Sequence, residues 1–345
     1  MNLQKQQQEI LNVPLKSRSD SISTSTSIDS NDSVETKIEN GFYCWNSTRY
    51  LILIISLICF SLTWGNALAY NFTIICIENN FTEPKSAEVW KNESDKNDNL
   101  KNDKTYVFSQ NQQNLLLSAV AVGSIIGSVI LPYATSKLGI RIVFTIYGFI
   151  SAISTLLCPF AVSHGFPMFY IMRIGQGIAN SIGIPGLGAV TTPWSPISSS
   201  GIFLSLLSTH LQFGPIFTMP LAGQFCASSF GWQGIFYLQG GLTVIAFIAF
   251  FAIFNDSPKF HRNVSSKELS IINHGKLTNG ISKGLKIPYL KIFTDKSVIG
   301  VVIVSLGAGI GFQVLNQYGP VYLFKVLNFD IKHTGSAAAI PFIFH

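Results

Sequence analysis

The chain has 345 residues, of which 48% are hydrophobic and only 12% are charged, and its formal net charge is +6. Soluble domains carry about twice that charged share, and here no acidic residue occurs between Asp103 and Asp256. The composition therefore excludes an ordinary soluble fold. Because the basic residues flank the apolar runs, the net charge does not indicate nucleic-acid binding.

The N-terminal segment, residues 1–48, is rich in Ser, Gln, Asn and Asp and contains few apolar residues. Such a composition is typical of disorder, so we predict a disordered cytosolic tail. The first apolar run begins near Leu51 and is too long for the core of a signal peptide. It therefore predicts a membrane span that is retained in the protein.

Long uncharged runs predict seven membrane-spanning helices in an all-α fold. A helix needs about 20 mostly apolar residues to cross a bilayer, and it satisfies its own backbone hydrogen bonds there. Runs too long for one span are divided at turn signals in 163–165, 193–201 and 228–231. The expected spans are 51–74, 113–134, 142–162, 167–190, 203–224, 233–254 and 298–318. An eighth helix begins near Ser336 and is cut off at His345, so we expect a truncated chain.

This order of helices predicts a polytopic membrane protein in four parts. A six-helix N-terminal bundle at 49–254 follows the tail, and a cytosolic connector at 255–297 leads to a partial C-terminal bundle at 298–345. Such an order is typical of proteins built from two related bundles. The connector holds eight Lys and Arg residues, which suits a segment that lies against anionic headgroups.

The Lys and Arg residues near the helix ends predict a cytosolic N-terminus. Twelve of them fall on the side that this orientation makes cytosolic, and seven fall on the other side, in line with the positive-inside rule. The loop 78–111 then lies outside, together with the glycosylation sequons headed by Asn80 and Asn92. We expect a multi-pass protein of a plasma or vesicular membrane.

The five cysteines have no CxxC or metal-ligand spacing. Cys76 and Cys226 fall near the outer ends of predicted helices, which permits a bridge between them, but we favour free thiols. The chain also lacks a Gly-rich phosphate loop, an HExxH and a GxSxG motif. We therefore expect no enzyme activity, no metal and no cofactor, and an ion or solute gradient as the energy source.

Several short motifs occur in a fixed order from Arg49 to the end of the chain. Helix four carries R-x-x-Q-G at Arg173–Gly177 with Pro185 after it, and W-x-P follows at Trp194–Pro196. Further motifs are Met219–Gly223, Gly231-Trp232, Phe236-Tyr237, Ser257-Pro258, Tyr318–Tyr322 and Val326–Ile331. Together they resemble the anion:cation symporter family of the major facilitator superfamily, the group of vesicular glutamate transporters, sialin and sodium-phosphate cotransporters. The resemblance implies a partial twelve-helix fold and a transport function.

The departures from the family pattern fall on charged positions. In the loop between helices two and three, Ser136 replaces the acid of the superfamily motif G-x-x-x-D-x-x-G-x-x-R. Glutamate-type members carry an acid where Asn180 stands, an arginine in helix one where Asn66 stands, and a histidine in helix two near Leu117. Ser199-Ser200 replaces the E-R pair of the loop after helix four. The resemblance therefore implies an anion site with a reduced set of charges.

Arg173 is the only charged residue inside the predicted spans. An arginine deep in a membrane helix costs about 2.5–3.5 kcal/mol on insertion scales, so it faces a cavity or a partner. Gln176 and Asn180 follow at i+3 and i+7 on the same helix face. We predict that this face lines the central cavity and that the guanidinium holds a carboxylate or phosphate in a bidentate contact. The alternative is a structural arginine bonded to backbone carbonyls.

Other polar residues within the spans are further candidates for substrate contacts: Asn66 in helix one, and Gln313 and Asn316 in helix seven. Helices one, four, five and seven resemble the cavity-lining set of the superfamily. The alternative for each residue is a hydrogen bond between helices, which is the commoner role. His210 in helix five is a candidate for proton coupling because histidine titrates near neutrality. Its alternative is a neutral packing role.

The sequence thus predicts a secondary active transporter of small organic or inorganic anions that works by alternating access. Its partners are the lipid bilayer and a small-molecule or ion substrate, with no nucleic acid. The alternatives are a degenerate or truncated family member without transport activity, and a seven-helix receptor. Because the resemblance implies a cavity between two six-helix halves, we also expect the chain to need the missing half-bundle or a partner chain.

Overall fold

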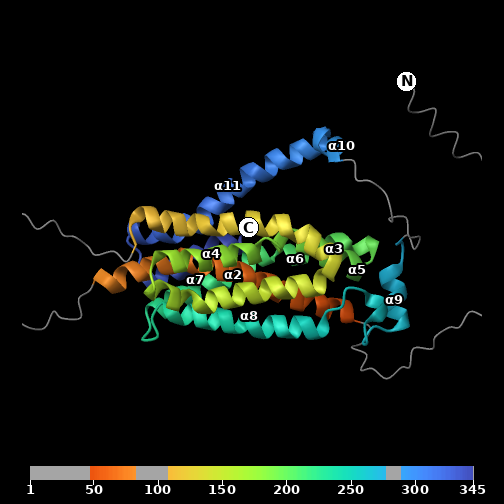
Figure 1. Cartoon of the computed structure of the whole chain (residues 1–345), viewed down its shortest axis with the longest axis horizontal. Coiled ribbons are helices and arrows are strands. Elements are labelled where there is room, and N and C mark those ends of the chain that lie inside the picture. Colours follow the sequence, from red (N-terminus) through yellow and green to blue (C-terminus); the bar gives the residue numbers. More distant parts are fainter. Residues whose placement is uncertain (1–46, 83–107, 277–288, 345) are drawn as a thin grey trace, which may run out of the picture. The chain divides into compact units, whose positions relative to one another are not determined.

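The computed structural model describes residues 47–82, 108–276 and 289–344, which belong to one compact unit, Gly41–His345. All regular elements within these residues are helices (Figure 1). Nearly all of the predicted tail and most of the predicted outer loop lie outside the described residues. The division of the chain into four parts therefore stays a prediction.

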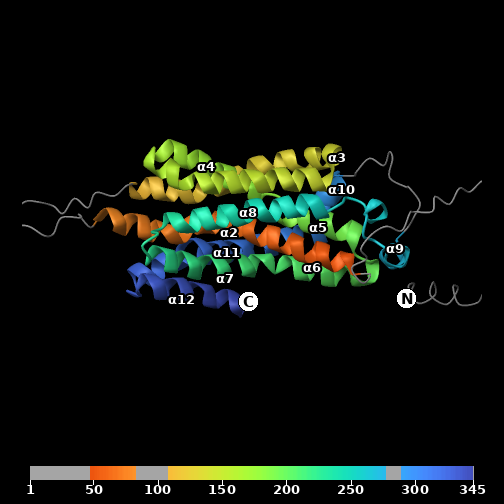
Figure 2. The same cartoon turned by 90° about the horizontal axis from the view of Figure 1, so that it is seen from below.

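The helices of the first bundle follow one another with short connections, including 3-10 turns at Ile197–Ser199 and Pro258–Phe260. They are α2 (Thr48–Thr82), α3 (Gln110–Ser163), α4 (Phe166–Asn180), α5 (Gly183–Trp194), α6 (Ser200–Ser208), α7 (His210–Cys226) and α8 (Gln233–Ile253). After the bundle come α9 (Ser266–Asn273), α10 (Tyr289–Thr294), α11 (Lys296–Lys325) and α12 (Ile331–Ile343). Figure 2 shows the long helices of the bundle running along one another.

Five stretches of the described residues are long and apolar enough to cross a membrane: 48–77, 110–163, 197–226, 233–253 and 296–325. They agree with the seven predicted spans once two features are taken into account. The stretch 110–163 contains a backbone break at Gly139 that divides it into two spans. The predicted fourth span is present as α4 and α5, each of which is too short to qualify alone.

The break inside α3 depends on a glycine and on an acid from beyond α8. Gly139 has φ 78° and ψ 164°, a conformation that residues with a side chain rarely adopt. A Cβ atom at this position would also collide with Asp256 Oδ2. The same carboxylate accepts a hydrogen bond from the backbone N–H of Arg141 at 2.8 Å. Asp256 therefore closes the turn between the second and third spans, in a loop where the usual acid is replaced by Ser136.

A proline explains the interruption between α4 and α5. Pro185 has no backbone N–H, and its ring conflicts with the carbonyl of the residue four positions earlier, which is Ser181. The chain responds with a turn at Ser181 and Ile182. Because α4 ends at Asn180, that side chain sits beside the interruption instead of inside a continuous helix.

Aromatic packing forms the core of the half of the bundle where α2 begins and α8 ends. Phe144 of α3 is fully buried and has three aromatic neighbours, with ring centroids 4.5 Å away for Phe60, 5.1 Å for Phe247 and 4.9 Å for Phe250. Edge-to-face and offset contacts of this kind add to the packing energy of the buried rings. They hold α2, α3 and α8 together in this half of the bundle.

Two glycines let α3 and α4 approach very closely. A Cβ atom on Gly123 would collide with the backbone oxygen of Ile174, and one on Gly177 would collide with the backbone oxygen of Val120. Gly123 also begins a small-xxx-small face, the pattern by which membrane helices bring their backbones together. This contact sets how far the side chains of α4 reach toward α2 and α3.

The described part of the connector is tied to the end of the bundle where α2 begins. The Glu268 side chain of α9 is buried and accepts a hydrogen bond from the backbone N–H of Arg49 at 3.0 Å. Lys276 Nζ donates to the backbone oxygens of Thr192 and Pro193, each at 2.9 Å. Partial burial lowers the pKa of Lys276. The connector thus covers the ends of α2 and α5.

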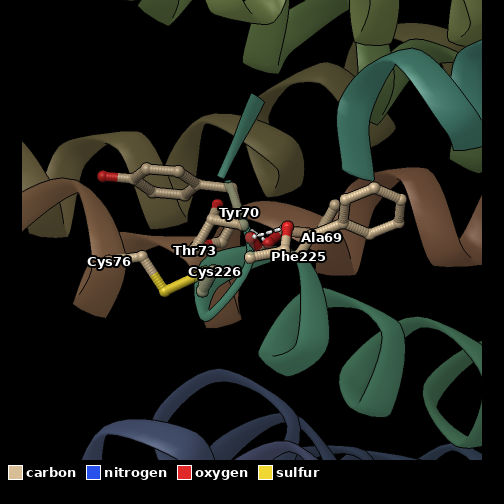
Figure 3. The surroundings of a disulfide bond; sticks show 7 residues. Ala69, Tyr70, Thr73, Cys76, Phe225 and Cys226 are labelled. Atoms are coloured by element: carbon tan, nitrogen blue, oxygen red, sulfur yellow. Dashed lines mark hydrogen bonds between the residues drawn. A yellow bond between two sulfur atoms is a disulfide. The ribbon is translucent and has the colours of Figure 1, made fainter. Parts of the chain in front are cut away.

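Cys76 of α2 and Cys226 of α7 form a disulfide, with Cα atoms 5.9 Å apart (Figure 3). Our preference for free thiols at this pair was therefore wrong, and the bridge that the sequence permitted is the arrangement found. The reason is that both helices end at the same level of the bundle, which their separation of 150 residues conceals. Cys59 and Cys158 are buried free thiols, and Cys44 lies outside the described residues.

The two helices after the connector pack on different members of the first bundle. α12 lies against α7, where a Cβ atom on Gly335 would come within 2.7 Å of the Met219 backbone oxygen. α11 contacts α2, and Asn316 and Pro320 are the buried residues among those described in α11. Its N-terminal half is exposed and diverges from the bundle (Figure 1).

Candidate functional site

Arg173 lies at the centre of the candidate site and is only 1% exposed. It belongs to the second half of α4, one helical turn before Gly177, where the glycine contact brings α4 against α3. Its side chain extends between α2 and α3. A charged group in such a place is tolerated only when polar atoms replace the water that it has lost.

Every hydrogen-bond acceptor of the Arg173 guanidinium is neutral. Nε donates to the Leu116 backbone oxygen at 3.2 Å, and Nη1 donates to the Ala67 backbone oxygen at 2.9 Å. Nη1 also donates to Gln176 Oε1 at 2.7 Å, and Nη2 donates to Asn71 Oδ1 at 3.4 Å. The positive charge is therefore held by dipoles and is not balanced by a carboxylate within the described part of the chain.

An aromatic ring completes the surroundings of the guanidinium. The carbon atom of the guanidinium lies 4.8 Å from the centre of the Tyr70 ring, within the range of a cation–π contact. Tyr70 is itself buried, and the Phe169 ring packs edge-on against it at 5.1 Å. These contacts fix the plane of the guanidinium, and Nη2 has the longest of its hydrogen bonds.

A cavity of about 450 Å³ opens beside Arg173 between α2, α3, α4 and α11. Its polar lining consists of Arg173 together with uncharged side chains, which are Asn71, Ser118, Ser124, Asn180, Gln313 and Gln317. Trp64 and several aliphatic residues form the remaining wall. No acidic side chain lines this cavity among the described residues, so its only formal charge is positive.

The structure brings three of the predicted site residues to this cavity: Arg173, Asn180 and Gln313. Gln176 is fully buried and lies outside the lining. It binds Arg173 through Oε1, and its Nε2 donates to Thr155 Oγ1 at 3.0 Å. A shared helix face is therefore not sufficient for a shared cavity, because the contact with α3 covers Gln176. Its place in the structure is that of a residue that orients the guanidinium.

Asn66 and Asn316 also lie outside the cavity lining. Asn66 Nδ2 donates to Ser151 Oγ at 2.9 Å and to Thr243 Oγ1 at 3.0 Å, which links α2 to α3 and α8. Asn316 is fully buried in α11, and its Nδ2 donates to the Phe312 backbone oxygen at 2.9 Å. The arrangement of Asn66 matches the alternative of a hydrogen bond between helices, whereas the Asn316 side chain bonds within α11.

His210 stands apart from Arg173 at the start of α7. Its Nδ1 lies 2.8 Å from the Leu207 backbone oxygen, and its ring is 5.4 Å from that of Phe60. It does not line the cavity. Of the two predicted glycosylation sites, Asn80 falls in the last turn of α2, and Asn92 lies outside the described residues.

Asn71 is a site residue that sequence reasoning missed, whereas Gln317 belongs to the group of polar residues that the sequence shows in helix seven. Asn71 contacts Arg173 directly, and Gln317 Nε2 donates to the Leu117 backbone oxygen at 3.1 Å from α11. A usable signal was present for Asn71, since Trp64, Ala67 and Asn71 recur at helical spacing and all three line the cavity. The signal for Gln317 was a polar side chain within an apolar span.

Residues 50–344 match the sequence model of the Major Facilitator Superfamily. Among curated proteins, the chain is 25% identical to sialin of Ovis aries over 240 residues, which is 70% of this chain and 48% of that protein. It is 24% identical to sodium-dependent phosphate transport protein 1 of Mus musculus over 299 residues, covering 86% of this chain and 63% of that protein. A probable small intestine urate exporter of Mus musculus is 25% identical over 262 residues, which is 75% of this chain and 52% of that protein. The chain thus spans about half to two-thirds of the length of these relatives.

Solved structures with the same fold are also transporters by their titles. A D-xylose-proton symporter superposes with a TM-score of 0.55 at 18% identity, over 85% of this chain and 66% of that one. A bacterial homologue of the human lysosomal transporter Spinster gives a TM-score of 0.57 at 13% identity, over 85% and 59% of the two chains. At these identities the likeness establishes the helical fold alone.

Proposed function

Since the chain belongs to the Major Facilitator Superfamily, whose sequence model covers residues 50–344, we propose that the protein is a secondary active transporter of small organic or inorganic anions. The superfamily consists of membrane transporters and not enzymes. The membership also sets aside the seven-helix receptor. Relatives whose names refer to phosphate and urate support an anionic substrate.

The observation that carries this proposal is the unbalanced charge of Arg173. A buried guanidinium with only neutral acceptors faces a cavity that contains no acidic side chain among the described residues. An anion that enters the cavity would supply the missing negative charge. Hydrogen bonds between charged groups are about twice as strong as those between neutral groups. An anion can therefore displace a neutral acceptor from this guanidinium.

Nη2 is the nitrogen through which we propose that the anion binds. Its bond to Asn71 is 3.4 Å long, whereas both bonds of Nη1 are shorter than 3.0 Å. A carboxylate or phosphate oxygen would replace the longest bond first, while Gln176 and the two backbone oxygens keep the guanidinium in place. Asn180 and Gln313 would then contact the uncharged parts of the substrate from α4 and α11.

The coupling ion is a separate part of the proposal. No carboxylate in the described cavity lining can carry a proton, so a proton-coupled mechanism would need a group outside this lining, and His210 of α7 is our candidate. We propose that an ion or solute gradient drives the cycle. Alternating access would move α11 and α12 relative to the first bundle, which they contact mainly through α2 and α7.

The disulfide supports the proposed orientation in the membrane. Disulfides persist in oxidising compartments and are rare in the cytosol, so the ends of α2 and α7 that carry Cys76 and Cys226 belong on the outer or lumenal side. The N-terminal tail and the connector then face the cytosol, as the Lys and Arg distribution predicts. The plasma membrane or a vesicle membrane would provide this environment.

A partner for α11 is the last part of the proposal. Ile303, Val304 and Ile310 of α11 are each more than 60% exposed, and the N-terminal half of α11 contacts no other described helix of the bundle closely enough to bury a residue. We propose that further transmembrane helices, from this protein or a partner chain, cover this face and complete the cavity.

Uptake tests the proposed function, and it is measured on the protein reconstituted together with the further transmembrane helices that cover α11. We expect saturable, gradient-dependent uptake of at least one member of a panel containing phosphate, urate and carboxylates, and none of a matched set of neutral solutes. Arg173→Gln should abolish that uptake at equal reconstitution. If wild-type protein moves no anion under sodium, proton or substrate gradients, the degenerate family member becomes the correct description.

A further inference from the structure

We propose that Asn71 couples occupancy of the anion site to the position of α11. This inference rests on the proposed function, because it assigns Arg173 as the group that binds the anion. In the structure, Asn71 of α2 donates a hydrogen bond to α11. When an anion occupies Arg173, Asn71 releases α11.

One amide side chain reaches both the guanidinium and α11. Asn71 is 4% exposed. Its Oδ1 accepts from Arg173 Nη2, and its Nδ2 donates to the backbone oxygen of Asn316, each at 3.4 Å. Arg173, Asn71 and Asn316 therefore form a chain of hydrogen bonds from α4 through α2 to α11.

A proline in α11 explains why the Asn316 backbone oxygen needs an outside donor. In a continuous helix this carbonyl would accept from the N–H of the residue four positions later. That residue is Pro320, which has no N–H. The carbonyl is left without its helical partner in a buried part of α11, and Asn71 provides the missing donor. The sequence of α11 thus creates an acceptor that a neighbouring side chain can satisfy.

Several other contacts hold this part of α11 to the bundle, including Val321 and Phe324, which pack against the buried apolar cluster that contains Tyr70 and Phe169. Gln317 Nε2 donates to the Leu117 backbone oxygen at 3.1 Å, and the Phe312 and Trp64 rings stack at 6.3 Å. Asn316 and Pro320 are the buried residues among those described in α11. The hydrogen bonds of Asn71 and Gln317 therefore join α11 to α2 and α3 beside this apolar packing, and a change at Asn71 removes one of them.

The binding of an anion changes the hydrogen bonds of Asn71. The anion takes the Nη2 hydrogens, so Asn71 Oδ1 loses its donor. The amide group can then turn its N–H toward the anion, which is the stronger acceptor. The Asn316 carbonyl loses its donor in the same step. The contact between α2 and α11 weakens, and α11 becomes free to move with the rest of its bundle.

Distances between spin labels on α4 and α11 test this coupling. Ile171 and Tyr322 are 60% and 54% exposed, so each accepts a label without disturbing the core. Both are replaced by cysteine in a chain that also carries Cys44→Ser. The label pair is measured in the purified protein without anion, with inorganic phosphate, and with urate.

In the wild-type background we expect a narrow distance distribution without anion and a broader, shifted one with the anion that binds. Asn71→Leu should give the broad distribution without anion and no further change with it. Asn71→Asp offers a second variant that keeps its size and its contact with Arg173. It cannot donate to Asn316, so it should also release α11, and it should weaken anion binding at least tenfold by occupying the guanidinium.

Thr73→Val is the matched control, since Thr73 is buried in the same helix and donates only to the backbone oxygens of Ala69 and Tyr70 (Figure 3). It should behave like wild type in every sample.

The coupling is wrong if Asn71→Leu and Asn71→Asp keep the narrow distribution without anion, or if a bound anion leaves the wild-type distance unchanged. Failure of the proposed function gives a different result. Neither anion then binds, while the Asn71 variants still broaden the distance distribution in samples without anion. That outcome removes the anion coupling and leaves only a structural contact.

Discussion

At the scale of single residues, the charge of Arg173 is stabilised without being neutralised. Two backbone oxygens, two side-chain amides and one aromatic ring surround the guanidinium. Removing one partner from such a buried charge costs about 1.5–3 kcal/mol. The two amide residues beside Arg173 differ in how tightly they bind it. Gln176 accepts the shortest hydrogen bond of the guanidinium, and Asn71 accepts the longest.

Gln176→Glu tests whether the positive charge must stay unbalanced. A carboxylate at this position would lie against Nη1 and pair with the guanidinium, so we expect anion affinity to fall more than tenfold while the protein stays folded. Gln176→Leu should instead lower the stability by about 1–3 kcal/mol, because it leaves buried donors without acceptors. Anion binding and thermal unfolding of the purified protein measure the two effects.

Gln224→Glu is the control for added charge, since Gln224 is exposed in α7 and lies outside the cavity lining. It should leave anion affinity unchanged. Equal affinity in wild type and Gln176→Glu would show that Arg173 does not bind the substrate through its charge.

At the scale of helices, the close contact of α3 and α4 determines where Arg173 lies. Gly177→Ala would place a Cβ atom against the Val120 backbone oxygen and force the two helices apart. Overpacking of this kind costs about 1–3 kcal/mol, so we expect a lower unfolding temperature and weaker anion binding. The unfolding temperature and the dissociation constant of the same preparation provide the measurement.

Gly188→Ala is the matched change in α5, where a Cβ atom would meet nothing within 4 Å. We expect it to be neutral or stabilising by up to about 1 kcal/mol, because alanine favours a helix over glycine. If the two substitutions have the same effect, the glycine contact does not position Arg173.

The sequence was sufficient for the spans and insufficient for the contacts between them. Lengths of apolar runs predict membrane helices because the bilayer imposes a fixed thickness, and the predicted spans agree with the helices found. Which neighbour covers a helix face depends on packing, so Gln176 and Asn66 were placed in the cavity and in fact bond to α3. The contact between Asn71 and α11 could not be predicted, because the sequence does not show which side chain donates to the Asn316 oxygen that Pro320 leaves without a helical partner.

At the scale of the whole molecule, the disulfide provides a test of the orientation. In sealed vesicles with the extracellular side outward and with Cys44 replaced by serine, a membrane-impermeant reductant should make Cys76 and Cys226 reactive to an impermeant maleimide. Cys59 and Cys158 are buried and should stay unlabelled. Labelling that requires permeabilised membranes would reverse the proposed orientation, and labelling without reductant would mean that the pair is not bridged.

The central claim is that the unbalanced guanidinium of Arg173 is an anion-binding group, and equilibrium binding to the purified protein tests it most directly. Phosphate, urate and a set of carboxylates are titrated into wild type, Arg173→Lys and Arg173→Gln, with Gly188→Ala as the control for substitution in the same predicted span. At least one anion should bind wild type and the control equally. Arg173→Lys keeps the charge but loses the planar guanidinium that can bind an anion through two nitrogens. The affinity of this variant should fall at least tenfold, which is about 1.4 kcal/mol. Arg173→Gln should bind no anion. Unchanged affinity in Arg173→Gln would contradict the account.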